Sequence, residues 1–420
     1  MRMKLFIRAG LATIAILGAP AAEAQVGRRF PPEKQVIVDP VTKRPIIFLT
    51  SGKSSDSKPY QTHPSWAADG VHIVFRSSTR SPDGPQAFAV NEKTGDIIQL
   101  TEGEGVGISS LNLARKSNTL YYMRRSGSGP GGTTRLIRVD LTALIFDGMA
   151  GRVKPAGYEQ VVATMPAGHV EAGGFTLDAD ERTAYVGFDA RVAPPRPQGQ
   201  PVPQVPGGIR AIDLATGAVR TVLETQFRMG HVQANPFVPG EILYCHETGG
   251  DAPQRMWVVK ADGTGNRPLF EEGPTDWVTH EQFADANHVI FNLMGHQRGL
   301  RKRPTGVFVV SLRDGTVDDL GQLPVNAPSG PAGGFWHNAV TYDGRLAAAD
   351  DFDGNITLID RRTNARTLLS TGHVMRPDHA HPSFSADNKR LLIQSGLLTH
   401  GKTLALAIVP VDTATAGKPQ

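Results

Sequence analysis

The segment His63-Pro64-Ser65-Trp66-Ala67-Ala68-Asp69-Gly70 returns near the end of the chain as His381-Pro382-Ser383-Phe384-Ser385-Ala386-Asp387-Asn388. In both copies a histidine is followed by an aromatic residue, a polar turn and then an apolar run, at residues 71–75 and 390–393. Short β-branched and apolar runs on either side of an Asp-Gly or Asp-Asn turn are typical of antiparallel hairpins. The two segments therefore predict two copies of one β-repeat, far apart in the chain.

The same pattern begins five more times, in a looser form, at a spacing of roughly 40 to 55 residues, which is the spacing of propeller blades. These five starts lie near Leu111, Phe175, His231, His280 and His337. Seven units predict an all-β fold, a seven-bladed β-propeller. Residues 36–50 hold two further strands without a unit of their own, and we expect them to complete the last blade. Such closure hides the edges of the sheets. A pair of β-sandwiches and a β-helix are the alternatives.

The composition is that of a globular protein, with 40% hydrophobic and 20% charged residues. The net charge of +4 is compatible with an anionic partner but does not specify one. Because Cys245 is the only cysteine, no intrachain disulfide can form. The stability of the fold must therefore come from its hydrophobic core.

The N-terminus has the pattern of a secretory signal peptide. Basic residues precede a short apolar run, and Ala22-Glu23-Ala24 forms a small-x-small cleavage site. The apolar run is too short to span a bilayer. We therefore expect residues 1–24 to be a signal peptide and residues 25–420 to form a single propeller domain. The mature protein would be secreted or periplasmic.

Blade geometry predicts where polar residues gather. The first strand of a blade lines the central channel and the second returns antiparallel to it, so first-strand starts and second-strand ends share one mouth. We expect imidazole side chains around this mouth and cationic side chains at its edge. Imidazole is a suitable ligand for transition metals. A lone histidine at a strand start more often only makes local hydrogen bonds. The residues placed there are His63, His231, His280, His337, His379 and His381, the second-strand residues Arg76 and His246, and the basic run with Arg298, Arg301, Lys302 and Arg303.

Several of these residues stand in short motifs. In chain order the motifs are Gly230-His231-Val232-Gln233, Tyr244-Cys245-His246-Glu247, Thr279-His280-Glu281 and His379-Ala380-His381-Pro382-Ser383-Phe384. In this order they resemble the oligogalacturonate lyases, which degrade pectin. The resemblance covers most of the mature chain and is strongest from Arg210 to Phe384.

The resemblance implies a seven-bladed propeller that binds a manganese-type ion through three histidines and a glutamine. His280, His379 and His381 take the histidine positions. Arg376 stands where the glutamine is expected, so the chain departs from the family pattern there. Arg210 takes the position of the catalytic arginine, and either His231 or His246 takes that of the base.

Together these features predict a lyase that cleaves galacturonate-rich or related uronate oligosaccharides by metal-assisted β-elimination. His63, Arg76, His337 and Arg301 would bind the acidic oligosaccharide. Neither nucleic acid nor, for the mature protein, a membrane is expected as a partner.

Two other functions are compatible with the same fold. A non-catalytic scaffold similar to the periplasmic TolB propellers would show the same repeats, but it has no need for the histidine register. A propeller glycosidase would need two carboxylates flanking the scissile bond. Asp350, Asp351 and Asp353 are candidates for these carboxylates, without a clear pair.

Overall fold

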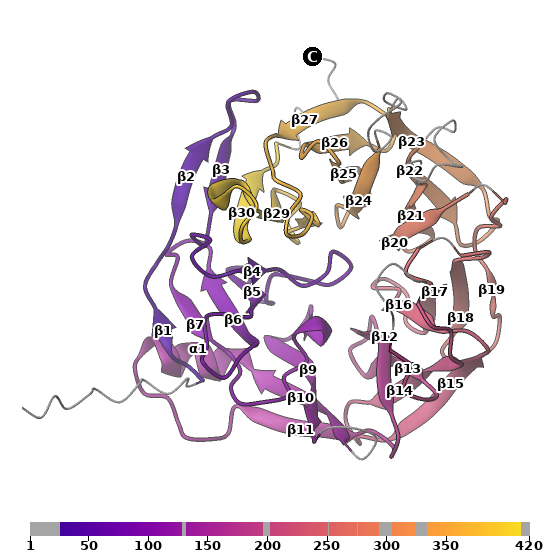
Figure 1. The fold of residues 1–420 in the computed structure, drawn as a ribbon, viewed down its shortest axis with the longest axis horizontal. Coiled ribbons are helices and arrows are strands. Elements are labelled where there is room, and N and C mark those ends of the chain that lie inside the picture. The colour runs from indigo at the N-terminus through magenta and orange to yellow at the C-terminus, as the bar shows by residue number, and fades with distance from the viewer. Residues whose placement is uncertain are drawn as a thin grey trace, which may run out of the picture.

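The computed structural model describes residues 26–127, 132–195, 202–250, 252–274, 276–293, 305–323 and 334–412. Their strands form seven antiparallel sheets that stand as blades around one axis, so the predicted seven-bladed propeller is confirmed (Figure 1). The proposed signal peptide, residues 1–24, lies outside the described residues. None of the helices in the described ranges has the length and apolar character needed to cross a membrane.

The strands of the first four blades, from the axis outward, are as follows. Blade 1 contains β4 (Asp56–Ser57), β5 (His72–Ser77), β6 (Gln86–Asn91), β7 (Ile97–Gln99) and β1 (Arg29–Phe30); blade 2 contains β8 (Asn112–Leu113), β9 (Thr119–Ser126), β10 (Thr133–Asp140) and β11 (Glu159–Thr164); blade 3 contains β12 (Val170–Leu177), β13 (Thr183–Asp189), β14 (Gly207–Asp213) and β15 (Val219–Thr225); blade 4 contains β16 (Met229–Ala234), β17 (Glu241–His246), β18 (Met256–Lys260) and β19 (Arg267–Pro268).

The remaining three blades and the helical turns complete the list. Blade 5 contains β20 (Val278–Asp285), β21 (His288–Leu293), β22 (Thr305–Ser311) and β23 (Val317–Leu323); blade 6 contains β24 (Phe335–Val340), β25 (Leu346–Asp351), β26 (Ile356–Asp360) and β27 (Arg366–Ser370); blade 7 contains β28 (Ser383–Phe384), β29 (Arg390–Ser395), β30 (Ala405–Pro410), β3 (Pro45–Phe48) and β2 (Gln35–Val38); the helical turns are η1 (Ile108–Ser110), α1 (Leu141–Met149) and η2 (Leu397–Thr399).

The two ends of the chain close the ring. The N-terminal strand β3 pairs with β30 near the C-terminus, with Ile47 opposite Ile408, which confirms the prediction for residues 36–50 (Figure 1). Strand β1 extends the other neighbour, blade 1, by pairing with β7, and the sequence did not predict this. N-terminal residues therefore complete the sheets on both sides of the closure.

A separate hydrophobic cluster fills each of the seven junctions between neighbouring blades. At the closing junction Trp66 of blade 1 packs with Leu392 and Leu406 of blade 7. Arg390 lies over the Trp66 ring and forms an ion pair with Glu92, which also accepts from the Trp66 indole nitrogen. The closing junction is thus as well packed as the others, which explains how the ring stays shut without a disulfide.

The inner strand of blade 1 is interrupted. Ser57 of β4 pairs with Arg76, and the next inner-strand contact is the bridge from Trp66 to Ile73. The residues between them leave the sheet and cross the axis of the ring, as the loop after β4 shows in Figure 1. We call residues 58–64 the channel segment. The prediction that His63 opens an inner strand is therefore wrong.

Asp39 links the closing strands to blade 6. This fully buried residue accepts from the N–H groups of Val41 and Thr42 in its own turn, and from the N–H and hydroxyl of Thr371 after β27. Burial alone would raise the pKa of Asp39, but these donors hold the pKa below its ordinary value.

We predict that Asp39→Ala lowers the free energy of unfolding at pH 7 by about 1.5–3 kcal/mol, because buried donors lose a charged acceptor. A lowered folded-state pKa gives stability that is present above the unfolded-state pKa and is lost as pH falls. The difference between wild type and variant, from urea unfolding, should therefore shrink below about pH 4. Asp213→Ala is the matched control, since Asp213 caps a similar but exposed turn. An equal loss in both variants would contradict the role of Asp39.

Candidate functional site

Four histidines occupy equivalent places near the start of the inner strands of blades 4 to 7. His231, His280 and His337 each lie inside a β-bulge of the first hairpin, and His381 precedes β28. A bulge bends its strand and re-aims a side chain. Three of the four also have left-handed backbones, with φ of 49° at His231, 56° at His280 and 47° at His381. Non-glycine residues in this region are strained, and such residues gather at functional sites.

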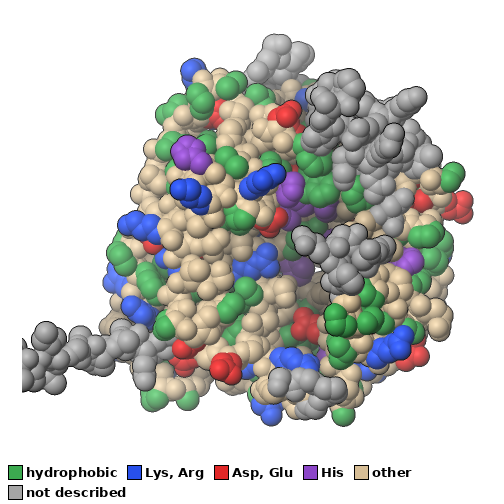
Figure 2. All heavy atoms as spheres, in the orientation of Figure 1, with side chains coloured by type: hydrophobic (Ala, Val, Ile, Leu, Met, Phe, Trp, Pro, Cys, Tyr) green, Lys and Arg blue, Asp and Glu red, His purple; other side chains and the backbone are tan. Residues whose placement is uncertain are grey.

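The imidazoles of blades 5, 6 and 7 form one cluster. The ring of His337 lies at its centre, 4.1 Å from His280, 3.8 Å from His381 and 5.5 Å from His379 between ring centroids. Figure 2 shows histidine side chains gathered in the central hollow of the face seen in Figure 1. We call this end of the channel the histidine mouth. The sequence prediction that imidazoles of separate blades meet there agrees with these distances.

A buried carboxylate holds this cluster in place. Asp350, at the end of the second strand of blade 6, accepts from the backbone N–H groups of His337 at 2.6 Å, Ala380 at 3.1 Å and His381 at 3.2 Å. Its second oxygen also lies 3.1 Å from Nδ1 of His337. Burial raises the pKa of Asp350, and the His381 imidazole and the N–H donors oppose this change. Asp350 thus fixes the backbone of two blades and the orientation of the central imidazole.

The channel segment forms the floor of the histidine mouth. The Tyr60 ring lies 5.2 Å from the His231 ring and 5.3 Å from the His381 ring. Gln61 Oε1 accepts from His381 Nδ1 at 2.9 Å, while Gln61 Nε2 is buried without a partner among the described residues. Lys58 is almost fully buried, and its Nζ donates to the Pro59 carbonyl. An insertion in blade 1 therefore supports side chains from blades 4 and 7.

His231 stands between two carboxylates. Its Nδ1 is 3.8 Å from Oε1 of Glu281, which is fully buried, and its Nε2 is 3.8 Å from Oε2 of the more accessible Glu247. Arg255 compensates the charge of Glu281 through an Nε–Oε2 contact of 3.1 Å. His231 Nδ1 and Glu281 Oε1 are both buried and lack a hydrogen bond within the described part of the chain. The imidazole of His231 is thus near carboxylates but is not tied to either.

Burial keeps these histidines uncharged near neutral pH. It lowers the pKa of each side chain, and at His231 and His379 the neighbouring carboxylates only partly oppose this effect. The affected residues are His231, His280, His337 and His379. A neutral imidazole can accept a proton or bind a cation, so the electrostatics of the mouth allow both kinds of chemistry.

An aromatic wall next to the cluster was missed from the sequence. The Trp336 ring lies 4.8 Å from the His280 ring and 5.2 Å from the His379 ring, and it packs on Trp277 and Phe352. Trp336 and Phe352 are half-buried. Trp336 directly precedes His337 in the sequence. An aromatic residue next to a histidine of the mouth was the feature from which this wall could have been predicted. Such a wall offers a flat surface for a sugar ring.

Other predicted site residues lie at the edge of the mouth. Arg76 donates to Ser57 beside the start of the channel segment. His246, at the end of β17, stacks on Phe227 and bonds Gln204. Arg210 lies on the third strand of blade 3, over the Phe188 ring, and bonds the buried His169. Arg301 and the rest of the run 298–303 lie outside the described residues.

His63 is separated from the imidazole cluster. Its Nε2 bonds the carbonyl of Phe175 in blade 3 at 2.8 Å, and its Nδ1 bonds Thr62. The residue lines the cavity on the other side of the channel segment. Its place at the histidine mouth, expected from the register, is not observed.

Comparison with known proteins gives relatives over nearly the whole chain. The curated oligogalacturonide lyase of Pectobacterium atrosepticum is 26% identical over 419 residues, covering 91% of this chain and 98% of the relative. The oligogalacturonate lyase of Dickeya dadantii is 26% identical over 406 residues, covering 89% and 95%. The chain is thus similar to curated oligogalacturonate lyases over about nine-tenths of its length.

A solved oligogalacturonate lyase in complex with manganese has the same fold as this chain, with a TM-score of 0.73, 21% identity and coverage of 93% of this chain and 99% of that one. No protein-family model matches the sequence.

His280, His379 and His381, which the resemblance places at the metal-ligand positions, have side chains of a type that binds divalent cations. Nδ1 of His280 and Nδ1 of His379 are buried without hydrogen-bond partners in the described ranges, and both imidazoles are neutral. The described residues contain no group of three His, Cys, Asp or Glu side chains already arranged around a metal position. Arg376 stands at the position where the resemblance implies a glutamine, directly before a cis proline. An amide side chain is nevertheless found beside His381, and it is that of Gln61. The mouth thus offers imidazole donors that small side-chain movements could bring together.

We predict that Asp350→Asn lowers the free energy of unfolding by about 2–4 kcal/mol, because an amide nitrogen would face N–H groups that need an acceptor. Asp351→Asn serves as the matched control, since Asp351 accepts only within its own turn, from Asp353 and Asn355. Urea unfolding of both variants measures the difference. A loss for Asp350→Asn no larger than that for Asp351→Asn would show that the cluster does not depend on this carboxylate.

Proposed function

We propose that this chain is a lyase that cleaves galacturonate-rich oligosaccharides by β-elimination at the histidine mouth. The observation that carries the proposal is the meeting of imidazoles from four blades around Tyr60 and His337. The names of the curated relatives support the substrate and the lyase activity. A purely structural scaffold would have no use for strained, unpartnered histidines at the end of its channel.

β-Elimination from a uronate removes a weakly acidic proton next to the carboxylate, and negative charge then develops on that carboxylate. The electron pair next forms a carbon–carbon double bond while the bond to the glycosidic oxygen breaks, and this oxygen leaves with the other half of the oligosaccharide and takes up a proton. A divalent cation bound to the carboxylate would act as a Lewis acid toward the developing charge. His280, His379 and His381 would hold the cation, and manganese is our choice of ion because the similar solved lyase contains it. Imidazole nitrogen is a suitable donor for manganese and its neighbours.

His231 is the better candidate for the base. It is uncharged, its ring lies against the Tyr60 edge at the centre of the mouth, and its Nε2 faces the more open side. A base in this position takes the proton from the carbon, and Glu281 and Glu247 stabilise the imidazolium that forms. His246 lies at the rim, bonded to Gln204, which fits substrate binding better than proton removal.

The remaining predicted residues would orient the oligosaccharide. Arg210 offers a guanidinium for a neighbouring carboxylate, since Arg and carboxylate match in a bidentate geometry. Arg76 would bind the oligosaccharide from the edge of the mouth and His337 from the centre of the cluster, and Trp336 would stack on a sugar ring. We also propose that residues 1–24 direct export, so that the enzyme meets its substrate outside the cytoplasm.

The activity is tested by mixing purified protein and Mn²⁺ with a galacturonate oligomer and following ultraviolet absorbance. Elimination creates a carbon–carbon double bond conjugated with the carboxylate, so absorbance should rise with time. Chelation should stop the rise and added Mn²⁺ should restore it. If absorbance stays flat on galacturonate oligomers and on other uronate polymers, the proposed function is wrong.

We predict that His280→Ala lowers both bound metal, measured by elemental analysis, and turnover, the latter by about a hundredfold or more, because the cation stabilises developing charge. His231→Ala should lower turnover by a similar factor but keep the metal. His288→Ala is the matched control, because His288 occupies an outer turn, where it bonds Asp285. Full activity in His280→Ala would remove that residue from the site.

A further inference from the structure

The channel has a second chamber, on the far side of the channel segment from the histidine mouth. It is a cavity of about 1040 Å³, including the open space at its entrance, and all seven blades line it. Its walls come from later parts of the same inner strands, such as Gln233 in β16, and from the loops that follow them, such as the loop with Phe237. We call this end the amide mouth.

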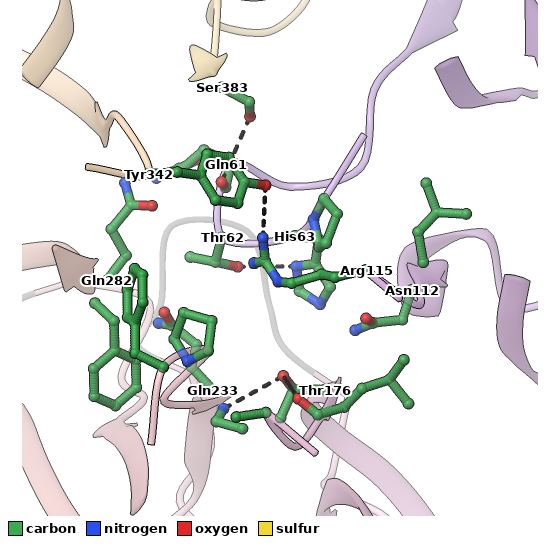
Figure 3. Close-up of a pocket in the computed structure, with 18 of the residues that line it drawn as sticks. Gln61, Thr62, His63, Asn112, Arg115, Thr176, Gln233, Gln282, Tyr342 and Ser383 are labelled. Atoms are coloured by element: carbon green, nitrogen blue, oxygen red, sulfur yellow. Dashed lines mark hydrogen bonds between the residues drawn. The ribbon is translucent and has the colours of Figure 1, made fainter. Parts of the chain in front are cut away.

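Three amide side chains, those of Asn112, Gln233 and Gln282, line this cavity (Figure 3). Asn112 Nδ2 donates to the Phe175 carbonyl, Gln233 Nε2 to the Glu281 carbonyl, and Gln282 Nε2 to the Asn338 carbonyl. Because a backbone carbonyl can only accept, each bond fixes the amide nitrogen against the wall and leaves the amide oxygen on the other side. No donor among the described residues bonds these three oxygens.

The deeper wall also contains an unpartnered donor. Gln61 lines the cavity, is 5% exposed, and has a buried Nε2 without a hydrogen bond in the described part of the chain. A buried amide donor without an acceptor costs free energy, and amide oxygens that face a cavity remain available to a ligand. A ligand that both donates and accepts hydrogen bonds, as a sugar hydroxyl does, would satisfy both.

A cationic side chain and aromatic side chains lie at the entrance of this cavity. The Arg115 guanidinium of blade 2 reaches the hydroxyl of Tyr342 in blade 6 at 2.6 Å and lies over its ring (Figure 3). Neither contact neutralises the charge of Arg115. Pro236 and Phe237 complete the rim, and Phe237 is 40% exposed. Together these residues could hold a carboxylate at the arginine and a sugar face against the rings.

We propose that the amide mouth is a second, non-catalytic binding site for an acidic monosaccharide. The carboxylate would bind Arg115, and the hydroxyls would donate to the oxygens of Asn112, Gln233 and Gln282. The choice of a uronic acid rests on the proposed function, whereas the arginine and the amide oxygens are independent of it. The channel segment separates this site from the histidine mouth, so the two can be tested apart.

The test is isothermal titration of the full chain with D-galacturonate, which has no glycosidic bond to eliminate. Wild type and His280→Ala should both bind one molecule per chain. Arg115→Ala and Asn112→Leu should weaken binding by about tenfold or more, since each removes one polar partner. Lys116→Ala is the matched control on the same rim, where its Nζ donates to Ala179, and should change little. Neutral D-galactose should bind more weakly than D-galacturonate.

Three results would overturn the proposal: no saturable heat with wild type, loss of binding in His280→Ala with no change in Arg115→Ala, or equal affinity for galactose. Heat on adding a divalent cation that disappears in Asn112→Leu but not in His280→Ala would instead assign the amide oxygens to a metal. Melting temperatures confirm that each variant is folded. Because the signal is heat of binding, a chain without lyase activity can still confirm this site.

Discussion

The carboxylate of Asp350 couples the fold to the site. It is buried at the junction of blades 6 and 7, where an ionised group is tolerated only if donors surround it. Those donors are the backbone of His337 and of the segment that contains His381. The same interaction that holds the two blades together therefore sets the position of the imidazole cluster. Any change that shifts one blade against the other would disperse the histidines.

Ring closure supplies the second constraint. Blade 7 is completed by β3 and β2, and Asp39 between them binds the end of blade 6. The junction that carries Asp350 is therefore held from the outside by N-terminal strands and from the inside by the carboxylate. Strained left-handed histidines need such rigid surroundings, because the backbone strain would otherwise relax and the side chains would turn away.

The channel segment divides the channel into two chambers with different chemistry. Toward the histidine mouth it presents Tyr60 and the amide oxygen of Gln61, and toward the other chamber it presents Thr62 and His63. The first chamber is lined with imidazoles, and the second with amide side chains and with the charged residues Arg115, Lys116, Asp178 and Glu181. A single insertion in blade 1 thus separates a place suited to chemistry from a place suited to binding.

The sequence predicted features that depend on local pattern. The repeat of His63–Gly70 in residues 381–388 led to the prediction of seven blades. The two strands at residues 36–50, which have no unit of their own, led to the prediction of ring closure. Both predictions were possible because turns and strand periods are local properties of the sequence. It also placed His280, His337, His379 and His381 at one mouth, since every blade runs in the same direction. It did not predict the left-handed backbones, because these depend on packing around each bulge.

Features that depend on contacts between distant segments were missed. His63 has the right motif, but residues 58–64 leave the sheet and carry it to the other chamber. The roles of Asp350, Tyr60 and Gln61 come from neighbours in other blades, which no spacing in the chain reveals. Arg210 was singled out by resemblance, yet its pairing with His169 appears only in the folded blade, where β13 lies between β14 and the start of β12.

The central claim is that imidazoles from separate blades bind one divalent cation at the histidine mouth. Anomalous diffraction from crystals soaked in Mn²⁺ tests it most directly. The account predicts one strong peak bound by His280, His379 and His381, above Tyr60 of the channel segment. A peak bound elsewhere, or no peak at any Mn²⁺ concentration that the crystals tolerate, would contradict it.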